Sequence, residues 1–389
     1  MKVVSKLPPP SIDMSLLLTE AQRRESRLID RLRSLVEIES PSSDKEAVDR
    51  ALTSFAEWAQ AAGGTIRRHK HRQYGDSLEV RFSGSSSREK PILLLGHLDT
   101  VWDHGTIVHM PWRATKYIIA GPGVLDMKSG VMMALTAVEM LQDLHLLHRP
   151  VIILLHGDEE IGSPASRKVT EAVASRCSSV YVLEPAQGDE GAYKTARKAV
   201  GMYRLAVHGT AAHSGVDFER GHSAIIELAR QIETLSDFTD LSRGITVNPG
   251  LIGGGTRSNV IAAEAWAEID VRLERQRDVT TLDRKFKKLR SQDKFCKLEL
   301  TGGINRPPME RTTGTIALFR RAKELASRMN IELEEAATGG GSDGNFTSAL
   351  GVPTLDGMGA VGSGAHAIHE HLQRKHIAPR LALLAAMLI

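Results

Sequence analysis

Residues 92–101 read Ile-Leu-Leu-Leu-Gly-His-Leu-Asp-Thr-Val, a short apolar run that ends in a polar cluster. Two later stretches repeat this pattern: residues 151–160 read Val-Ile-Ile-Leu-Leu-His-Gly-Asp-Glu-Glu, and residues 180–185 read Val-Tyr-Val-Leu-Glu-Pro. Continuous apolar runs of this length are typical of strands buried on both faces of a parallel sheet. Apolar residues at helical spacing occupy residues 129–147, between the first two runs. The alternation predicts an α/β fold with parallel strand pairs.

The polar clusters stand where these predicted strands end. His97 follows the first run, Glu159 and Glu160 follow the second, and Glu184 follows the third. In open α/β sheets, ligands bind beyond the carboxyl ends of the strands. A glycine-bracketed loop also presents Asp126 just before the predicted helix. Histidine and carboxylate side chains at one sheet edge predict a shared metal site, because zinc takes ligands of these types.

Each of these features has a simpler explanation when it is taken alone. A histidine after a strand is more often a hydrogen-bonded core or surface residue than a ligand. A Glu-Glu pair is usually solvated, and an aspartate before a helix usually caps that helix. Three acidic strand ends beside buried apolar runs favour a metal site over these separate explanations. Asp99, two residues after His97, is spaced to orient the imidazole by a hydrogen bond.

The pattern changes near residue 198, where an independent β-α-β-β-α-β unit is predicted. Its predicted strands lie at residues 200–208, 245–252 and 264–273, and its predicted helices at about 221–235 and 278–291. After Pro307-Pro308 the helix–strand alternation resumes. We therefore predict a catalytic domain in two parts, residues 1–197 and 307–389, interrupted by an inserted α+β domain over residues 198–306.

Length and composition fit two domains, because the chain has 389 residues and a domain takes about 150. A net charge of +3 without a long basic block argues against a nucleic-acid partner. The two cysteines form no C-x-x-C pair, which excludes a disulfide scaffold and a cysteine zinc finger. The sequence shows neither a signal peptide nor a membrane span. We expect a soluble cytoplasmic protein with a disordered arm over residues 1–15.

Taken together, the motifs resemble one family of co-catalytic di-zinc metallopeptidases. That family includes the folate-cleaving glutamate carboxypeptidase, acetylornithine deacetylase, succinyl-diaminopimelate desuccinylase and the aminoacylases. The resemblance runs from about residue 25 to the last residue and leans toward the glutamate carboxypeptidase branch. It rests on residues 96–101, 121–130, 157–163, 184–185, 209–215, 258–261, 270–272, 339–343 and 364–366.

The resemblance implies a fold and a metal centre. The fold is a three-layer α/β catalytic domain with a mixed sheet, and the insert is a ferredoxin-like domain for dimerisation that also acts as a lid. Two Zn²⁺ ions are implied per chain, for which Co²⁺ can substitute. Asp126 matches the carboxylate that bridges both ions, and the peptide bond that follows it is cis in this family. His97 and Glu184 match the other ligands of one ion.

The ligands of the second ion and the catalytic base are implied in the same way. Glu160 and His366 match the ligands, and Glu159 matches the general base. Three histidines stand close together at residues 366, 369 and 371. Family members place the ligand after a Gly-small-residue step, with a glutamate four residues later, and His366 with Glu370 fits that pattern. His369 and His371 are then expected to face solvent or the rim of the pocket.

The resemblance also assigns residues of the inserted domain. His213 matches a histidine that acts in the partner subunit's active site and donates to the oxyanion, although a lone histidine in a Gly-rich turn is normally a surface residue. Asn259 and Arg272 match other polar groups that face the substrate, and an ion pair at a strand edge is an equally good explanation for Arg272. Arg306 matches an arginine that binds a substrate carboxylate, a task that suits guanidinium.

The Gly-rich segment holds the last candidates for substrate binding. Gly340, Gly341 and Ser342 would let backbone N–H groups approach a carboxylate, although a triple glycine equally suits a flexible linker. With the metal centre, these matches imply a zinc-dependent hydrolase that cleaves an amide or peptide bond next to a carboxylate-bearing amino acid, as a glutamate-type carboxypeptidase does. The predicted substrate is a small molecule or short peptide with a free carboxylate.

Two alternatives stay open at this point. The first is an N-acyl-amino-acid deacylase. It differs from a carboxypeptidase in which side of the cleaved amide bond carries the bulky part of the substrate. The second is a non-catalytic dimeric binding protein, which would be expected to lack the base or a ligand. We also expect a homodimer that forms through the inserted domain.

Overall fold

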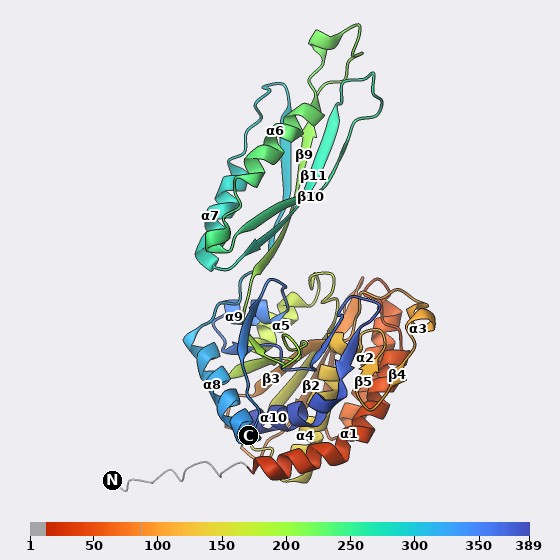
Figure 1. Cartoon of the computed structure of the whole chain (residues 1–389), viewed down its shortest axis with the longest axis vertical. Coiled ribbons are helices and arrows are strands. Elements are labelled where there is room, and N and C mark those ends of the chain that lie inside the picture. Colours follow the sequence, from red (N-terminus) through yellow and green to blue (C-terminus); the bar gives the residue numbers. More distant parts are fainter. Residues whose placement is uncertain (1–12, 87) are drawn as a thin grey trace, which may run out of the picture. The chain divides into compact units, whose positions relative to one another are not determined.

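The computed structural model of the chain describes residues 13–86 and 88–389 (Figure 1). The described chain divides into two compact units. The first unit comprises Met1–Thr195, Thr312–Ala336 and Val352–Ile389, and the second comprises Ala196–Arg311 and Ala337–Gly351. The domain boundaries drawn from the sequence stay a prediction.

A six-stranded sheet forms the centre of the first unit. The strands β3, β6, β7 and β14 run parallel, whereas β2 runs antiparallel to β6 and β1 runs antiparallel to β2. The predicted α/β fold with a mixed sheet is therefore confirmed. In spatial order the strands are β1 (Thr65–His69), β2 (Gly75–Phe82), β6 (Val151–Gly157), β3 (Ile92–His97), β7 (Ser179–Val182) and β14 (Thr354–Leu355).

Helices cover both faces of this sheet, because its central strands are apolar on both sides. Leu93 and Leu154 belong to a core shared with α5 (Arg167–Ala174). Their neighbours Leu94 and Ile153 face the opposite way, into the larger core. The predicted three layers follow from this alternation. The helices of the larger core are α1 (Met14–Glu37), α2 (Lys45–Ala61), α4 (Ser129–Asp143), α8 (Thr313–Ser327) and α10 (Ile377–Leu388).

The central parallel strands end at the same edge of the sheet. His97 of β3 is in register with His156 of β6, and Leu95 of β3 is in register with Val182 of β7. The polar residues that follow these three strands are thereby gathered at one edge, as the sequence predicts.

A small four-stranded sheet brings the Asp126 loop beside the C-terminal part of the chain. His371 of β16 pairs with Ala120 of β5, the last residue before the loop. The loop then contains helix η1 (Val124–Lys128) and leads into α4. The strands of this sheet are β15 (Gly362–Ser363), β16 (His371–Gln373), β5 (Ile118–Ala120) and β4 (Arg113–Ala114), and α3 (Thr106–His109) precedes β4.

The second unit contains an antiparallel four-stranded sheet in the order β10-β11-β9-β12. Helices α6 and α7 cover one face of this sheet (Figure 1). The predicted β-α-β-β-α-β insert is confirmed. Its main elements are β9 (Ala199–His208), α6 (Ala224–Ser236), β10 (Thr246–Gly254), β11 (Glu264–Leu273), α7 (Gln276–Lys287) and β12 (Lys297–Arg306). The remaining described elements are β8 (Tyr193–Arg197), β13 (Glu335–Thr338), α9 (Gly344–Ala349) and the short helices η2 (Phe218–Arg220), η3 (Leu241–Arg243) and η4 (Arg374–His376).

Helix α1 begins inside the segment that was predicted to be a disordered arm. The Asp13 side chain accepts the N–H groups of Ser15 and Leu16 and caps α1, so Met14 and Ser15 are helical. The prediction of disorder is wrong at these residues, and the rest of the arm, residues 1–12, lies outside the described residues. In the described part of the chain, no helix combines the length and hydropathy that crossing a bilayer requires. The cytoplasmic location stays a prediction.

Candidate metal centre

The structure gathers the predicted ligands of the first unit into one cluster. His97 ends β3, the Glu159-Glu160 pair follows β6, and Glu184 follows β7. Asp126 lies within η1 at a kink where the backbone is not helical, and its peptide bond with Met127 is cis, as the resemblance implies. His366 lies between β15 and β16. Residues from five separate segments therefore meet at the edge where the parallel strands end.

The carboxylate of Asp126 faces two histidines, one with each oxygen. Its Oδ1 lies 3.2 Å from Nε2 of His97, and its Oδ2 lies 3.4 Å from Nε2 of His366. His366 Nε2 also lies 3.2 Å from Glu160 Oε2. This arrangement puts Asp126 in the central position that a bridging carboxylate requires.

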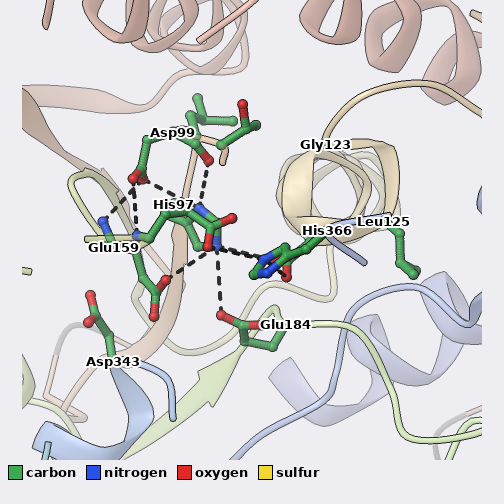
Figure 2. A network of polar contacts seen from close by, with 12 residues as sticks. His97, Asp99, Gly123, Leu125, Glu159, Glu184, Asp343 and His366 are labelled. Atoms are coloured by element: carbon green, nitrogen blue, oxygen red, sulfur yellow. Dashed lines mark hydrogen bonds and ion pairs between the residues drawn. The ribbon is translucent and has the colours of Figure 1, made fainter. Parts of the chain in front are cut away.

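His97 is the shared member of two groups that could hold a cation. One group is His97, Asp126 and Glu160, and the other is His97, Glu159 and Glu184, with the ligand atoms of each within 4.8 Å of one another. Figure 2 shows His97 directed toward Glu159 and Glu184. Its Nε2 lies 3.7 Å from Glu184 Oε1 and 4.0 Å from Glu159 Oε2. By distance alone, Glu159 could therefore ligate the same ion as His97 and Glu184.

Buried polar atoms without partners show that the cluster fits a metal. Among the described residues, Nε2 of His97, Oδ1 of Asp126 and Oε1 of Glu160 are buried and have no hydrogen-bond partner. Such atoms are costly unless an ion or water satisfies them. Imidazole and carboxylate ligands are those that zinc takes, so the donor set fits zinc.

The pKa shifts show how strongly this pocket favours positive charge. Burial alone would lower the pKa of His97, but the carboxylates of Asp126 and Asp99 raise it well above its usual range. Burial alone would raise the pKa of Asp126, but the neighbouring His366 and His97 lower that pKa below its usual range. Hydrogen bonds to the carboxylates of Asp126 and Glu160 raise the pKa of the half-exposed His366 to about 10. A metal cation at this point would take over the role of these protons.

Asp99 holds the cluster by contacts that its spacing to His97 did not predict. Nδ1 of His97 lies 2.9 Å from the main-chain oxygen of Asp99, and 3.4 Å from its carboxylate. Because a carbonyl oxygen only accepts, Nδ1 carries a proton and Nε2 faces the cluster. The Asp99 carboxylate instead accepts the N–H groups of Glu159 (3.2 Å) and Glu160 (3.1 Å) and the hydroxyl of Ser42 (2.7 Å). Asp99 thereby fixes the position of both glutamates.

Of the three clustered histidines, the structure brings His366 to the cluster. Its backbone has φ of 62°, an uncommon left-handed conformation for a residue other than glycine. His371 instead directs Nδ1 toward the main-chain oxygen of His369, at 2.8 Å. The choice of His366 as the metal-ligating candidate agrees with this geometry.

The candidates in the inserted domain lie in the second unit. His213 and Asn259 belong to neighbouring loops, because His213 forms a bridge with Val260 and the N–H of Ser214 donates to the oxygen of Asn259. His213 is exposed. Arg272 on β11 forms an ion pair with Asp270 at 2.8 Å, which is the strand-edge pair considered from the sequence.

Arg306 is buried and tightly held within the second unit. It pairs with Asp343 at 3.0 Å, and its guanidinium lies over the ring of Phe346. The main-chain oxygens of Gly340 and Gly341 accept from Arg197, and a Cβ added to Gly341 would come within 2.8 Å of Arg306 Cδ. Ser342 is buried, and its N–H donates to Asn345. Glycine at position 341 is therefore what lets this loop approach Arg306.

Comparison with known proteins identifies the family. Residues 93–389 match Peptidase family M20/M25/M40. The chain belongs to this family. The predicted family resemblance and the prediction of a metallopeptidase are both confirmed.

Several relatives of known name share this family membership or fold. Carboxypeptidase G2 of Pseudomonas sp. (strain RS-16) is 26% identical over 386 residues, which cover 96% of this chain and 91% of the relative. Aminopeptidase PepT of Bacillus cereus has the same fold, with a TM-score of 0.78, 18% identity and coverage of 94% of this chain and 98% of that chain. An M20 family metallo-carboxypeptidase of Sulfolobus solfataricus also has this fold, with a TM-score of 0.74 and 18% identity. The match covers 93% of this chain and 98% of that chain.

Two residues that hold the surroundings of the metal cluster were not predicted from the sequence. Ser42 holds the carboxylate of Asp99, and no motif signals it. Trp102 donates its indole N–H to Glu370 at 2.8 Å, and its place just after residues 96–101 is the only hint in the sequence. Both act on residues that touch the cluster, so they emerge only from the folded structure.

We predict that His366→Ala reduces the zinc retained per chain after dialysis, because it removes a ligand candidate of the cluster. His104→Ala is the matched control. Both side chains are 50% exposed and both face a carboxylate, but His104 pairs with Asp44 outside the cluster. Mass spectrometry of the bound metal measures the effect. Equal zinc content in the two variants would contradict the placement of His366.

Proposed function

We propose that the chain is a di-zinc hydrolase that cleaves an amide or peptide bond next to a carboxylate-bearing amino acid, as a glutamate-type carboxypeptidase does. The observation that carries the proposal is the position of Asp126, with one oxygen toward His97 and the other toward His366. A carboxylate shared in this way suits a site for two ions about 3.5–4 Å apart. His97 and Glu184 would hold one zinc, and Glu160 and His366 the other.

Glu159 is the proposed general acid and base. Two bound zinc ions would polarise the amide carbonyl and make water acidic enough to react at neutral pH. The carboxylate of Glu159 would take the proton of the attacking water and then deliver it to the departing nitrogen. Asp99 fixes the backbone of Glu159, so the base has a defined position. Co²⁺ is expected to replace zinc.

Arg306 supports a substrate with a free carboxylate. Its guanidinium is held in one direction by Asp343 and Phe346, and a fixed guanidinium suits recognition of a carboxylate. We assign the same task to the N–H groups of Gly340 and Gly341. The N–H of Ser342, predicted with them, already donates to Asn345 and is left out of this task. The relation to carboxypeptidase G2 over 96% of the chain supports cleavage next to a C-terminal amino acid. Deacylation of an N-acyl amino acid is the second candidate.

A substrate panel tests this proposal most directly. The purified protein, loaded with Zn²⁺, is incubated with acyl-glutamates, dipeptides and acetyl-amino acids, and the released amino acid is measured. We expect the highest kcat/KM on substrates that present a free α-carboxylate, with acyl-glutamates leading the panel. Preference for short acetyl groups with little regard for the amino acid would favour the deacylase. Hydrolysis of none of these compounds would contradict the proposal.

The two neighbouring glutamates should respond differently to the same substitution. Glu159→Gln should lower kcat by about 10²–10⁴ while the zinc content is kept, because the base is lost but the ligands are not. Glu160→Gln is the matched comparison and should lose zinc. Metal analysis and kcat are measured on the same samples. Parallel loss of zinc in Glu159→Gln would make Glu159 a ligand, as its 4.0 Å distance to His97 allows.

We further propose that the protein is a homodimer formed through the inserted domain. Strand β10 is an edge of its sheet, and an edge strand needs a partner or a cover. Large apolar side chains are exposed on β10 and on the adjoining helix α6: Leu251 (59%), Ile252 (65%), Ile225 (45%) and Ile226 (54%). Two inserts paired through this face would bury these side chains. His213 would then donate to the oxyanion in the partner subunit's active site.

Complementation between inactive variants tests the shared active site. His213→Ala is mixed with Glu159→Gln under conditions of subunit exchange, and each alone should lose about 10²–10³ in rate or more. A mixed dimer has one site with both native residues. Activity should therefore recover to at most about a quarter of wild type, because half the dimers are mixed and half their sites are intact.

The control mixture pairs Glu159→Gln with His97→Ala. Both of these residues belong to the same chain's site, so no mixed dimer regains an intact site. Recovery in the first mixture and none in the control supports exchange of His213 between subunits. No recovery in either mixture, despite proven exchange, would contradict the shared site.

A further inference from the structure

Glu370 is a fully buried glutamate beside the metal cluster that is neither a ligand candidate nor the proposed base. Its carboxylate accepts four hydrogen bonds, two at each oxygen. Oε1 accepts the backbone N–H groups of Leu125 (2.8 Å) and Asp126 (3.1 Å). Oε2 accepts the N–H of Gly123 (3.0 Å) and the indole N–H of Trp102 (2.8 Å). Burial raises the pKa of Glu370, and all four donors act in the opposite direction because each one favours the carboxylate form.

Three of these four donors belong to the loop that carries Asp126. Figure 2 draws Gly123 and Leu125 of this loop beside the cluster. The N–H of Asp126 itself donates to Glu370, while the side chain of Asp126 faces His97 and His366. Glu370 thus fixes the backbone from which the proposed bridging carboxylate projects. A shift of this backbone would move both Asp126 oxygens relative to the two histidines.

A buried lysine, Lys128, holds the C-terminal end of the same loop by hydrogen bonds. Nζ of Lys128 donates to the main-chain oxygens of Leu35 (3.0 Å) and Ile38 (2.9 Å) at the end of α1. Burial lowers the pKa of Lys128 to about 8, and the negative charge of Glu370 opposes that shift. The two charged side chains therefore hold the loop on either side of Asp126, one through its N–H groups and one through α1.

We propose that Glu370 is a positioning residue that sets the metal affinity of the centre by holding the Asp126 loop in its metal-binding shape. The inference rests on the proposed metal centre. Glu370 reaches the metal through Asp126 and does not touch the ions or the substrate. A hydrogen-bond partner of this kind typically changes metal affinity by about 10–100-fold when it is removed.

The required group is a carboxylate, because all four partners are donors. In Glu370→Gln, one oxygen becomes an NH₂ group that would face two N–H donors. At least two hydrogen bonds are lost, and buried donors are left without an acceptor. The loop is then expected to shift so that those donors find other partners, and Asp126 is expected to move with it.

The test compares zinc affinity in Glu370→Gln and in the matched control Glu227→Gln. Glu227 is also fully buried, and its carboxylate also accepts four hydrogen bonds, from Arg230, Gln231 and the N–H groups of Gln292 and Asp293. It lies on α6 of the inserted domain, outside the metal cluster. Folded metal-free protein is titrated with Zn²⁺ against a chromophoric chelator, and thermal unfolding is recorded for each variant.

We expect Glu370→Gln to bind zinc about 10–100-fold more weakly than wild type, with an altered visible spectrum of the Co²⁺ form. Glu227→Gln should lose thermal stability but keep wild-type zinc affinity and the wild-type Co²⁺ spectrum. Wild-type affinity and spectrum in Glu370→Gln would overturn the inference and leave Glu370 a purely structural residue. Failure of the wild-type protein itself to bind zinc would instead count against the proposed function.

Trp102→Phe provides a milder variant if Glu370→Gln does not fold. It removes one of the four donors to Glu370 and keeps an aromatic ring in place. The expected loss of zinc affinity is smaller but in the same direction, because three of the four bonds remain. Unchanged affinity in Trp102→Phe, with Glu370→Gln unfolded, would also overturn the inference.

Discussion

The crowding of carboxylates around one buried carboxylate, Asp126, is the constraint on which the rest of the structure depends. Glu159, Glu160 and Glu184 lie around His97, and Glu160 also faces His366. The carboxylate of Asp99 lies on the Nδ1 side of His97. Like charges gathered in a buried pocket repel one another strongly unless cations compensate them. Without a metal the two imidazoles take up that role, which is why the pKa of each is raised. The composition of this pocket therefore fits divalent cations.

The pocket is formed by the edge of the sheet and by two loops beside it, the loop of Asp126 and the loop of Glu159-Glu160. Strands β3, β6 and β7 end side by side because each is apolar on both faces and is buried between helix layers. The pairing of β16 with β5 carries the C-terminal segment to the Asp126 loop, where Glu370 accepts its N–H groups. Asp99 does the same for the Glu159-Glu160 backbone. Carboxylates that accept backbone N–H groups thus hold both the loop of Asp126, the proposed bridging residue, and the loop of Glu159, the proposed base.

The sequence predicts the parts of this arrangement that depend on local pattern. The apolar runs predict the strands, the acidic strand ends predict the metal site, and the order of elements predicts the inserted domain. Helix α10 was not predicted, because its residues, Ile377–Leu388, are apolar except for Arg380 and therefore show no helical period of apolar and polar positions. Strand β2 contains glycine, aspartate and glutamate, which are poor strand formers, and tertiary pairing with β6 overrides this preference. The hydrogen bonds of Asp99 and Glu370 join residues far apart in the chain, so they arise only when the fold is complete.

The number of zinc ions that the folded, metal-free protein takes up is the most direct measure of the central claim. Calorimetric titration of the full chain with Zn²⁺ gives that number and the affinity of each step. The account predicts two ions per chain in the wild-type protein, and loss of both in Asp126→Asn, because one carboxylate serves both sites. Binding of two ions that survives in Asp126→Asn, or no binding by the wild-type protein, would contradict it.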